Sequence, residues 1–348
     1  MKPDCIIDVL DKLGSIISNF LSLSEEERVA KYPELSTAVL DCHEQNSWFV
    51  KPFVINSLKG VSQWLNKDKL WSFYNENRIK FAKTPKTIGL IMAGNIPLVG
   101  FHDFIIVLLT GNKAVVKLSS KDTILLPTLV SYLEKDFPEI AKHISFVQEI
   151  TDNIDALIAS GTNNTMSYFS YKYGQIPSIL RGSRNSVAVI TGNETAEEIE
   201  ELTKDICLYF GMGCRSVSKI YLPDEECIKQ IQDSLSAYSW MTNHKDWSDN
   251  LRFQKAMMLT KGETFYDCGP VIMIQESKLN SPMSVVHFEI YKSIEEVKKS
   301  LKALDSMVQC VVGDAKIDNS WVPFGKSQYP DINDFADRIN TCDFIMQL

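Results

Sequence analysis

From residue 87 onward, short apolar runs alternate with longer segments of helical periodicity, and this alternation constrains the fold most strongly. The first run, at residues 87–93, ends at Gly94, and a helical stretch at 98–110 separates it from a second run at 114–118. Strands that alternate with helices at this pitch are typical of βαβ units and a mostly parallel sheet. Further strands are predicted at 143–147, 156–159, 187–191, 218–222, 271–274 and 308–312.

The first eighty or so residues are predicted to be helical instead, because their apolar residues recur at helical spacing. A Ser24-Glu25-Glu26-Glu27 segment marks one helix start, and a helix is predicted at 123–136. Thr195-x-x-Glu198 is a capping box that opens an amphipathic helix through about Phe210. The sequence therefore predicts an α/β protein with two lobes that meet near residues 182–190.

Charge and apolar pattern exclude several classes of protein. The chain carries 36 Lys and Arg against 44 Asp and Glu, a net charge of −8 without a basic stripe, so no nucleic-acid partner is expected. The longest wholly apolar run, residues 104–109, is far shorter than the ~20 residues that cross a bilayer, so no membrane insertion is expected. The eight cysteines are scattered, which predicts neither a metal site nor a disulfide framework. A reduced, cytoplasmic protein is the expectation.

A cysteine flanked by glycines stands between a predicted helix and a predicted strand, at Gly211-Met212-Gly213-Cys214. Flexible backbone there lets a substrate carbonyl approach the sulfur and lets nearby N–H groups point at an oxyanion. The thiolate is the nucleophilic form, and Arg215 favours ionisation if it points toward the sulfur. A buried structural cysteine beside a tight turn fits the position equally well, so the residues alone leave both interpretations open.

Two other polar segments follow predicted strands, at the rim where open parallel sheets bind ligands. Asn95 follows the first strand and can donate an uncharged hydrogen bond, but an asparagine that only shapes the turn before Pro97 also explains the position. Lys117, Ser119 and Ser120 lie at the end of the second strand, where a lysine and two hydroxyls suit ribose and phosphate. A solvated lysine is the simpler alternative there.

Together these segments resemble the aldehyde dehydrogenase superfamily. They are most similar to its acyl-CoA reductase branch, which includes the fatty-acid reductase of bacterial bioluminescence. The resemblance runs from about Lys83 to the C-terminus. It rests on the order and spacing of six short motifs, at Ala93–Pro97, Gly111–Lys117, Ser160–Thr162, Gly211–Cys214, Gly269–Val271 and Pro323–Gly325.

The resemblance implies a role for each matched residue. Cys214 is the nucleophile, and the Asn95 side chain and the Cys214 N–H are the donors to the oxyanion. The implied cofactor-binding residues are Lys117, Ser119, Ser120, Ser160, Gly161 and Thr162. The implied fold is α/β and aldehyde-dehydrogenase-like, with two Rossmann-like three-layer lobes. Its parts are a helical N-terminal segment at 1–85, a nucleotide-binding lobe at 86–185, a catalytic lobe at 186–325 and a C-terminal tail at 326–348.

Three positions depart from the family's pattern. The glutamate that activates hydrolytic water in aldehyde-oxidising members falls on Leu180, so hydrolysis loses its base, whereas exchange with a thiol needs none. The second cofactor glutamate falls on Tyr266, which puts the anchoring of the nicotinamide ribose in doubt. The glutamate that follows the ribose-binding lysine in NAD-preferring relatives falls on Ser120, with Lys121 next to it. This favours NADPH, with NADH as the alternative.

The resemblance therefore implies an NAD(P)H-dependent reductase that takes an acyl-CoA or another acyl-thioester and releases an aldehyde. Three alternatives remain open: a CoA-acylating aldehyde dehydrogenase working in the oxidative direction, a phosphate-activated carboxylate reductase, and a non-catalytic scaffold of the same fold. A homo-oligomer also stays open, because the N-terminal part is shorter than in the family.

Overall fold

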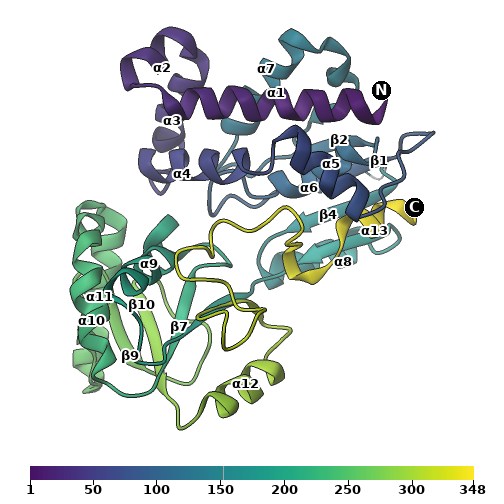
Figure 1. The fold of residues 1–348 in the computed structure, drawn as a ribbon. Coiled ribbons are helices and arrows are strands. Elements are labelled where there is room, and N and C mark those ends of the chain that lie inside the picture. Colours follow the sequence, from purple (N-terminus) through teal and green to yellow (C-terminus); the bar gives the residue numbers. More distant parts are fainter. Residues whose placement is uncertain (152) are drawn as a thin grey trace. The chain divides into compact units, whose positions relative to one another are not determined.

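The computed structural model describes residues 1–151 and 153–348 and divides into two compact units. The first unit comprises Met1–Ser183 and Asp331–Leu348, and the second comprises Arg184–Pro330. Each unit has its own β-sheet with helices packed against it (Figure 1). Within the described residues, no helix combines the length and the apolar character needed to cross a membrane.

The sheet of the first unit has five parallel strands in the order β3-β2-β1-β4-β5. Its strands are β1 (Thr87–Ile91), β2 (Lys113–Lys117), β3 (Ile144–Phe146), β4 (Ala156–Ser160) and β5 (Ser178–Arg181). The chain runs outward from β1 through β2 to β3 and then returns to the other side of β1. The strand order therefore reverses between β1 and β4, and such a switch point is where open α/β sheets bind ligands.

Each face of this sheet packs against its own hydrophobic core. Adjacent residues of a strand point to opposite faces, so they belong to different cores. Leu90 and Ile158 face the large core formed with the N-terminal helices, whereas Ile91 and Leu157 face a smaller core that includes Met166. The helices of the first unit are α1 (Pro3–Ser22), α2 (Glu25–Lys31), α3 (Pro33–Gln45), α4 (Lys51–Ser62), α5 (Lys67–Glu76), α6 (Phe101–Leu109), α7 (Leu125–Asp136), α8 (Asn163–Lys172) and α13 (Thr341–Met346), with 3₁₀ turns η1 (Pro138–Lys142) and η4 (Ala336–Arg338).

The C-terminal segment packs into the first unit, where α13 is drawn in yellow (Figure 1). Cys342 of this helix is buried in the large core. A buried ion pair joins Arg181 of β5 to Asp103 of α6. Thr341 connects the two, since its Oγ1 accepts from the Arg181 guanidinium at 3.0 Å and donates to Asp103 Oδ1 at 3.0 Å. Polar and apolar contacts thus both fix α13 to this sheet.

The sheet of the second unit has six strands in the order β11-β6-β7-β10-β9-β8, all parallel except β8. Its strands are β6 (Asn185–Val189), β7 (Val217–Leu222), β8 (Tyr266–Asp267), β9 (Ile272–Gln275), β10 (Val285–Ile290) and β11 (Val308–Val312). Its helices are α9 (Ala196–Cys207), α10 (Cys227–Leu235), α11 (Lys245–Lys261) and α12 (Ile294–Ala303), with 3₁₀ turns η2 (Leu208–Gly211) and η3 (Ser236–Asn243). Figure 1 shows α9, α10 and α11 on one side of this sheet and α12 on the other.

The predicted α/β class with mostly parallel sheets is confirmed, and so are the helix start at Ser24 and the capping box that begins α9. Helix α9 ends at Cys207, three residues before the predicted end. One further predicted boundary needs correction, and one interior strand was missed. The helix predicted from residue 98 begins at Phe101, because Leu98 and Gly100 take left-handed backbone conformations, with φ of 62° and 87°. Strand β10 was not predicted, because His287 and Glu289 interrupt its apolar run. It nevertheless pairs with β7 and β9 in the interior of the sheet.

Candidate active site

Exposure distinguishes Cys214 from the other cysteines. Cys214 is exposed, Cys5 is partly exposed, and the other six are buried. Burial raises the pKa of Cys42 and Cys268 to about 12, so these thiols stay protonated at neutral pH. A nucleophilic cysteine must be reachable by its substrate and able to ionise. The accessibility of Cys214 satisfies the first requirement, and it rules out the alternative of a buried structural cysteine.

The backbone that leads to Cys214 changes direction abruptly after α9. Tyr209, Phe210 and Gly211 follow one another with φ of 57°, 54° and 64°. A left-handed conformation costs a residue other than glycine on the order of 1–3 kcal/mol, so surrounding contacts must enforce it. Phe210 supplies such contacts, because its buried ring packs at centroid distances of 4.8 Å from His244 and 5.4 Å from Trp247. Aromatic packing thus supports the bend that precedes Cys214.

Hydrogen bonds hold the turn that carries Cys214. The Ser216 N–H donates to the Gly213 carbonyl at 2.9 Å and closes the turn. Ser186 Oγ, from β6, donates to the Cys214 carbonyl at 2.9 Å and accepts the Cys310 N–H of β11 at 3.2 Å. The Cys214 carbonyl is therefore fixed to two strands of the sheet while its side chain remains exposed.

Arg215 has a defined direction, which the sequence left open. Its Nε donates to the Ser327 carbonyl at 2.5 Å. Beside it, Gln328 Nε2 donates to Ser216 Oγ at 3.1 Å. Both residues that follow Cys214 are therefore bonded to the segment at residues 323–328, which holds the Pro-Phe-Gly motif.

Asn95 lies in the first unit, exposed on the loop that follows β1. This loop is fixed from two sides. Asp122 Oδ2 accepts the Leu98 N–H at 2.8 Å, and Ser57 Oγ of α4 donates to the Pro97 carbonyl at 2.7 Å. Both supporting side chains are buried. The loop thus has a defined course, and the left-handed Leu98 is held within it.

The predicted cofactor-binding residues lie at the carboxyl ends of the strands of the first sheet. Ile91 at the end of β1 is in register with Lys117 of β2 and with Ala159 of β4. The loops that follow these three strands are therefore neighbours. A side chain at Gly94 would place its Cβ 2.4 Å from Ser119 Oγ, so these two loops are in close contact. Ser119 is partly exposed, and Ser120 is exposed at the same end of the sheet.

Ser160, Gly161 and Thr162 connect β4 to α8. Thr162 is the N-cap of this ten-residue helix, and its Oγ1 accepts the Thr165 N–H at 3.3 Å. Gly161 has little free space, since a Cβ there would come 3.1 Å from the Met166 Cε. The start of α8 therefore lies directly after a strand at the switch point of the sheet, where helix N-termini bind phosphate groups.

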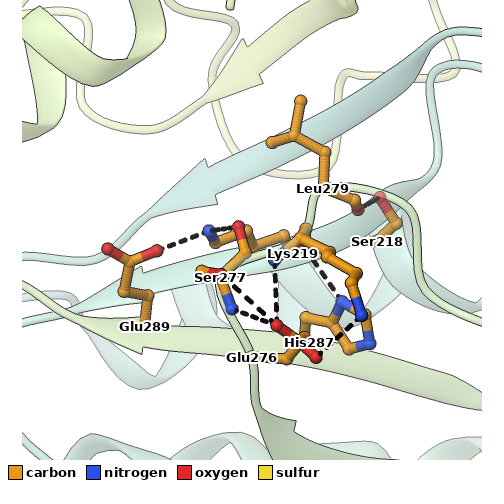
Figure 2. A network of polar contacts seen from close by, with 8 residues as sticks. Ser218, Lys219, Glu276, Ser277, Leu279, His287 and Glu289 are labelled. Atoms are coloured by element: carbon orange, nitrogen blue, oxygen red, sulfur yellow. Dashed lines mark hydrogen bonds and ion pairs between the residues drawn. The ribbon is translucent and has the colours of Figure 1, made fainter.

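Lys219, five residues after Cys214, is a buried lysine in the sheet of the second unit. Lys219 of β7 is 1% exposed, and its Nζ contacts Glu289 Oε2 and the Ser277 carbonyl, each at 2.5 Å. Figure 2 shows it within a polar network, where His287 Nδ1 also lies 2.9 Å from the Lys278 carbonyl. This network connects β7 to β10 and to the chain after β9, and it explains how polar residues fit an interior strand.

The positions of the two missing glutamates contain no carboxylate. Leu180 lies in β5, in register with Ala159 of β4, and packs against the smaller core of the first unit. Tyr266 lies in β8, and its hydroxyl donates to Glu225 Oε2. No cluster of three or more metal-ligating side chains occurs among residues 1–151 and 153–348. The histidine in helix α6, His102, lies 2.7 Å from the Ile332 carbonyl through Nε2, and burial lowers its pKa.

Comparison with known proteins identifies the family. The model of the acyl-CoA reductase (LuxC) family matches residues 1–250, well over half of the chain. The chain belongs to this family. It is 22% identical over 273 residues to the long-chain acyl-protein thioester reductase of Aliivibrio fischeri. That alignment covers 72% of this chain and 53% of the relative, so the chain spans about half the length of the curated relative it matches.

Solved structures confirm the aldehyde-dehydrogenase-like fold. Betaine aldehyde dehydrogenase from Staphylococcus aureus matches with a TM-score of 0.63 and 10% identity, over 93% of this chain and 75% of that one. An aldehyde dehydrogenase from Mycobacterium tuberculosis, solved with NAD⁺, matches with a TM-score of 0.58 and 14% identity, over 90% and 76%. At this identity the likeness establishes the fold.

The sequence motifs did not reveal the residues that support the two loops. Asp122 stands two residues after Ser120, but its partner Leu98 comes from the loop after β1. Asp205 occupies a buried position of α9 between the apolar residues Leu202 and Ile206. An acidic residue on the apolar face of an amphipathic helix is the one signal that could have indicated a special role.

Proposed function

We propose that this chain is an NAD(P)H-dependent acyl-thioester reductase with Cys214 as its nucleophile. The observation that carries the proposal is an exposed cysteine on a turn that contains two glycines, in a segment that resembles the superfamily's cysteine motif. The Aliivibrio relative is named a long-chain acyl-protein thioester reductase, which supports a long acyl chain as the substrate's acyl group.

In the proposed reaction the Cys214 sulfur attacks the carbonyl carbon of an acyl-CoA. The carbon–sulfur bond to the enzyme forms, the bond to CoA breaks, and CoA leaves as its thiol. Asn95 and the Cys214 N–H are the proposed donors to the oxyanion. When bound, NAD(P)H would supply the hydride that reduces the thioacyl group on Cys214 to a thiohemiacetal. Breaking its carbon–sulfur bond would release an aldehyde and return the free thiol of Cys214.

The residues of the first unit fit the adenosine and phosphate half of such a cofactor. The loops after β1, β2 and β4 meet at one sheet edge, Lys117 ends β2, and the N-terminus of α8 follows Gly161. The aldehyde dehydrogenase of Mycobacterium tuberculosis, which shares the fold, was solved with NAD⁺. We therefore propose that Lys117, Ser119 and Ser120 hold the adenosine ribose and that the α8 N-terminus holds the phosphates.

The absence of a carboxylate at Leu180 supports thioester exchange over hydrolysis. A thioacyl-enzyme that cannot activate water keeps its acyl group until a thiol or a hydride reaches it. The same residues support the reverse reaction, in which an aldehyde and CoA give an acyl-CoA. Intact Asn95 and Cys214 disfavour a non-catalytic scaffold.

The proposal is tested with a panel of acyl-CoAs of increasing chain length, each assayed for aldehyde formation with NADPH and with NADH. We expect aldehyde with both cofactors and the fastest turnover with long chains. In the reverse direction, an aldehyde should be oxidised only when CoA is present. Rapid formation of free acid without CoA would contradict the proposal, as would the absence of aldehyde with every acyl-CoA.

A further inference from the structure

In the second unit, a buried carboxylate holds the chain segment that is hydrogen-bonded to the turn of Cys214. Asp205 lies on the buried face of α9 and is 0% exposed. Its Oδ2 accepts the Gly325 N–H at 2.6 Å, and its Oδ1 accepts the Ser327 N–H at 3.0 Å. One carboxylate thus fastens two backbone groups of the segment at residues 323–328.

This segment is seated against α9 without free space. Gly325 has a φ of 76°, and a Cβ there would lie 1.9 Å from Glu201 Oε2. Glu201 stands one helical turn before Asp205 on α9. The backbone conformation and the lack of space both require a glycine, so the segment has one course along the helix.

The same segment contacts the turn of Cys214 at two points. The Ser327 N–H donates to Asp205, and the Ser327 carbonyl accepts a hydrogen bond from Arg215 Nε. Ser327 therefore connects the buried carboxylate to the residue that follows Cys214. Gln328 adds the bond to Ser216 Oγ. A continuous path of hydrogen bonds therefore runs from α9 through residues 325–328 to residues 215 and 216.

A carboxylate is the side chain that this position requires. It offers two acceptor oxygens to two backbone donors, whereas the amide of asparagine offers one acceptor and turns an N–H₂ group toward the other donor. Burial raises the pKa of Asp205 to about 6, so the ionised form that accepts both bonds predominates at neutral pH. Glu201 is the acidic neighbour that contributes to this shift, while the Gly325 and Ser327 N–H groups oppose it.

We propose that Asp205 is a positioning residue for Cys214: it holds the segment at 323–328, which fixes the nucleophile's turn through Arg215 and Ser216. The role of Cys214 in turnover rests on the proposed function, but the path of contacts does not. Its test therefore includes a readout that needs no substrate.

The experiment compares the full chain with its Asp205→Asn variant by hydrogen exchange and by kinetics. We expect amides at 211–217 and 323–328 to exchange about tenfold faster in the variant, while α11 is unchanged, because the contacts that protect them open locally. We also expect kcat to fall about 10²-fold with a nearly unchanged KM, since a misplaced nucleophile slows chemistry more than binding. The matched control is Asp233→Asn on α10, whose exposed side chain pairs with Lys229.

Arg215→Lys provides a second variant, because it removes the Nε donor and keeps the charge. Its kcat loss should not add to that of Asp205→Asn, since both changes interrupt one path. Unchanged exchange at 211–217 in folded Asp205→Asn, or additive losses in the double variant, would overturn the proposal. If Asp205→Asn does not fold, Arg215→Lys and Gln328→Ala decide, and unchanged exchange at 211–217 in both overturns it. If no acyl-CoA is turned over, the proposed function fails, while the exchange result still answers this question.

Discussion

The loop that carries Asn95 and the segment that holds the turn of Cys214 are each hydrogen-bonded to a buried aspartate, but the two aspartates accept different numbers of bonds. In each unit, a buried aspartate accepts backbone N–H groups, one in the case of Asp122 and two in the case of Asp205. The second oxygen of Asp122 is buried and has no hydrogen-bond partner within the described part of the chain. Asp205 therefore uses both of its oxygens, and Asp122 uses one.

The two aspartates therefore differ in how completely hydrogen bonds offset the burial of their carboxylate oxygens. A buried carboxylate is tolerated when its oxygens are hydrogen-bonded, and each buried oxygen without a partner costs about 1–3 kcal/mol. Burial raises the pKa of both aspartates to about 6, against an ordinary value of 3.8. The first unit thus leaves one oxygen of its buried carboxylate without a hydrogen bond among the described residues, whereas the second unit bonds both oxygens.

The largest expected effect distinguishes the Asn95 side chain from the loop that holds it. We expect Asn95→Ala to fold normally and to lose about 10²–10³-fold in kcat, the usual cost of removing one oxyanion donor. The measurement is steady-state aldehyde formation from an acyl-CoA. Asn75→Ala, at an exposed position of α5 in the same unit, is the control and should keep normal turnover. Normal turnover of Asn95→Ala would assign this residue to shaping the loop alone.

The next prediction compares the two aspartates directly at pH 7. Asp122→Asn keeps one acceptor for the single Leu98 N–H and removes an unpartnered charge, so it should not lower the free energy of unfolding. Asp205→Asn leaves one backbone donor without its acceptor, so it should lower the free energy of unfolding by about 1–3 kcal/mol. Urea unfolding of both variants measures the difference, and equal losses would contradict the comparison.

The pH dependence of stability sharpens the same comparison. Because the pKa of Asp122 is higher in the folded than in the unfolded chain, the folded state holds its proton more tightly. Between about pH 4 and pH 6 the unfolded state loses this proton first, so stability falls as pH rises. Wild type should therefore lose about 2–3 kcal/mol relative to Asp122→Asn from pH 4 to pH 7. A constant difference between the two proteins across this range would refute the assignment.

The smallest expected effect concerns Ser120, on the loop after β2 that we propose binds the adenosine ribose. Ser120→Glu places a carboxylate where NAD-preferring relatives have one, and this charge repels a 2′-phosphate. We expect the ratio of kcat/KM values for NADPH and NADH to shift toward NADH by about 1–2 kcal/mol, or five- to thirtyfold. Ser22→Glu, at the exposed last residue of α1, is the control for added charge. An unchanged ratio in Ser120→Glu would show that this loop does not contact the phosphate.

The sequence predicted the strands that are continuous apolar runs and missed those that polar residues interrupt. Strands β1, β2 and β11 coincide closely with predicted runs. Strand β10 could not be found in this way, because His287 is bonded to a carbonyl and Glu289 to Lys219 only once the sheet has formed. Periodicity reports burial of apolar side chains, and it cannot show which polar side chains will find partners.

The same limit applies to the candidate site. The motif residues Asn95 and Cys214 are recognisable because each stands in a short local pattern. The residues that hold them are not, because their partners are distant in sequence. Asp205 bonds to Gly325 at a separation of 120 residues. Ser186, which fixes the Cys214 carbonyl, is separated from it by 28.

If Cys214 carries the acyl group during turnover, that group can be trapped on its sulfur. The protein is incubated with a long-chain acyl-CoA in the absence of reductant, and its peptides are then analysed by mass spectrometry. We expect a hydroxylamine-sensitive acyl adduct on the peptide that contains Cys214, absent from Cys214→Ala and retained in Cys5→Ala. An adduct on another cysteine, or aldehyde formation by Cys214→Ala at the wild-type rate, would contradict it.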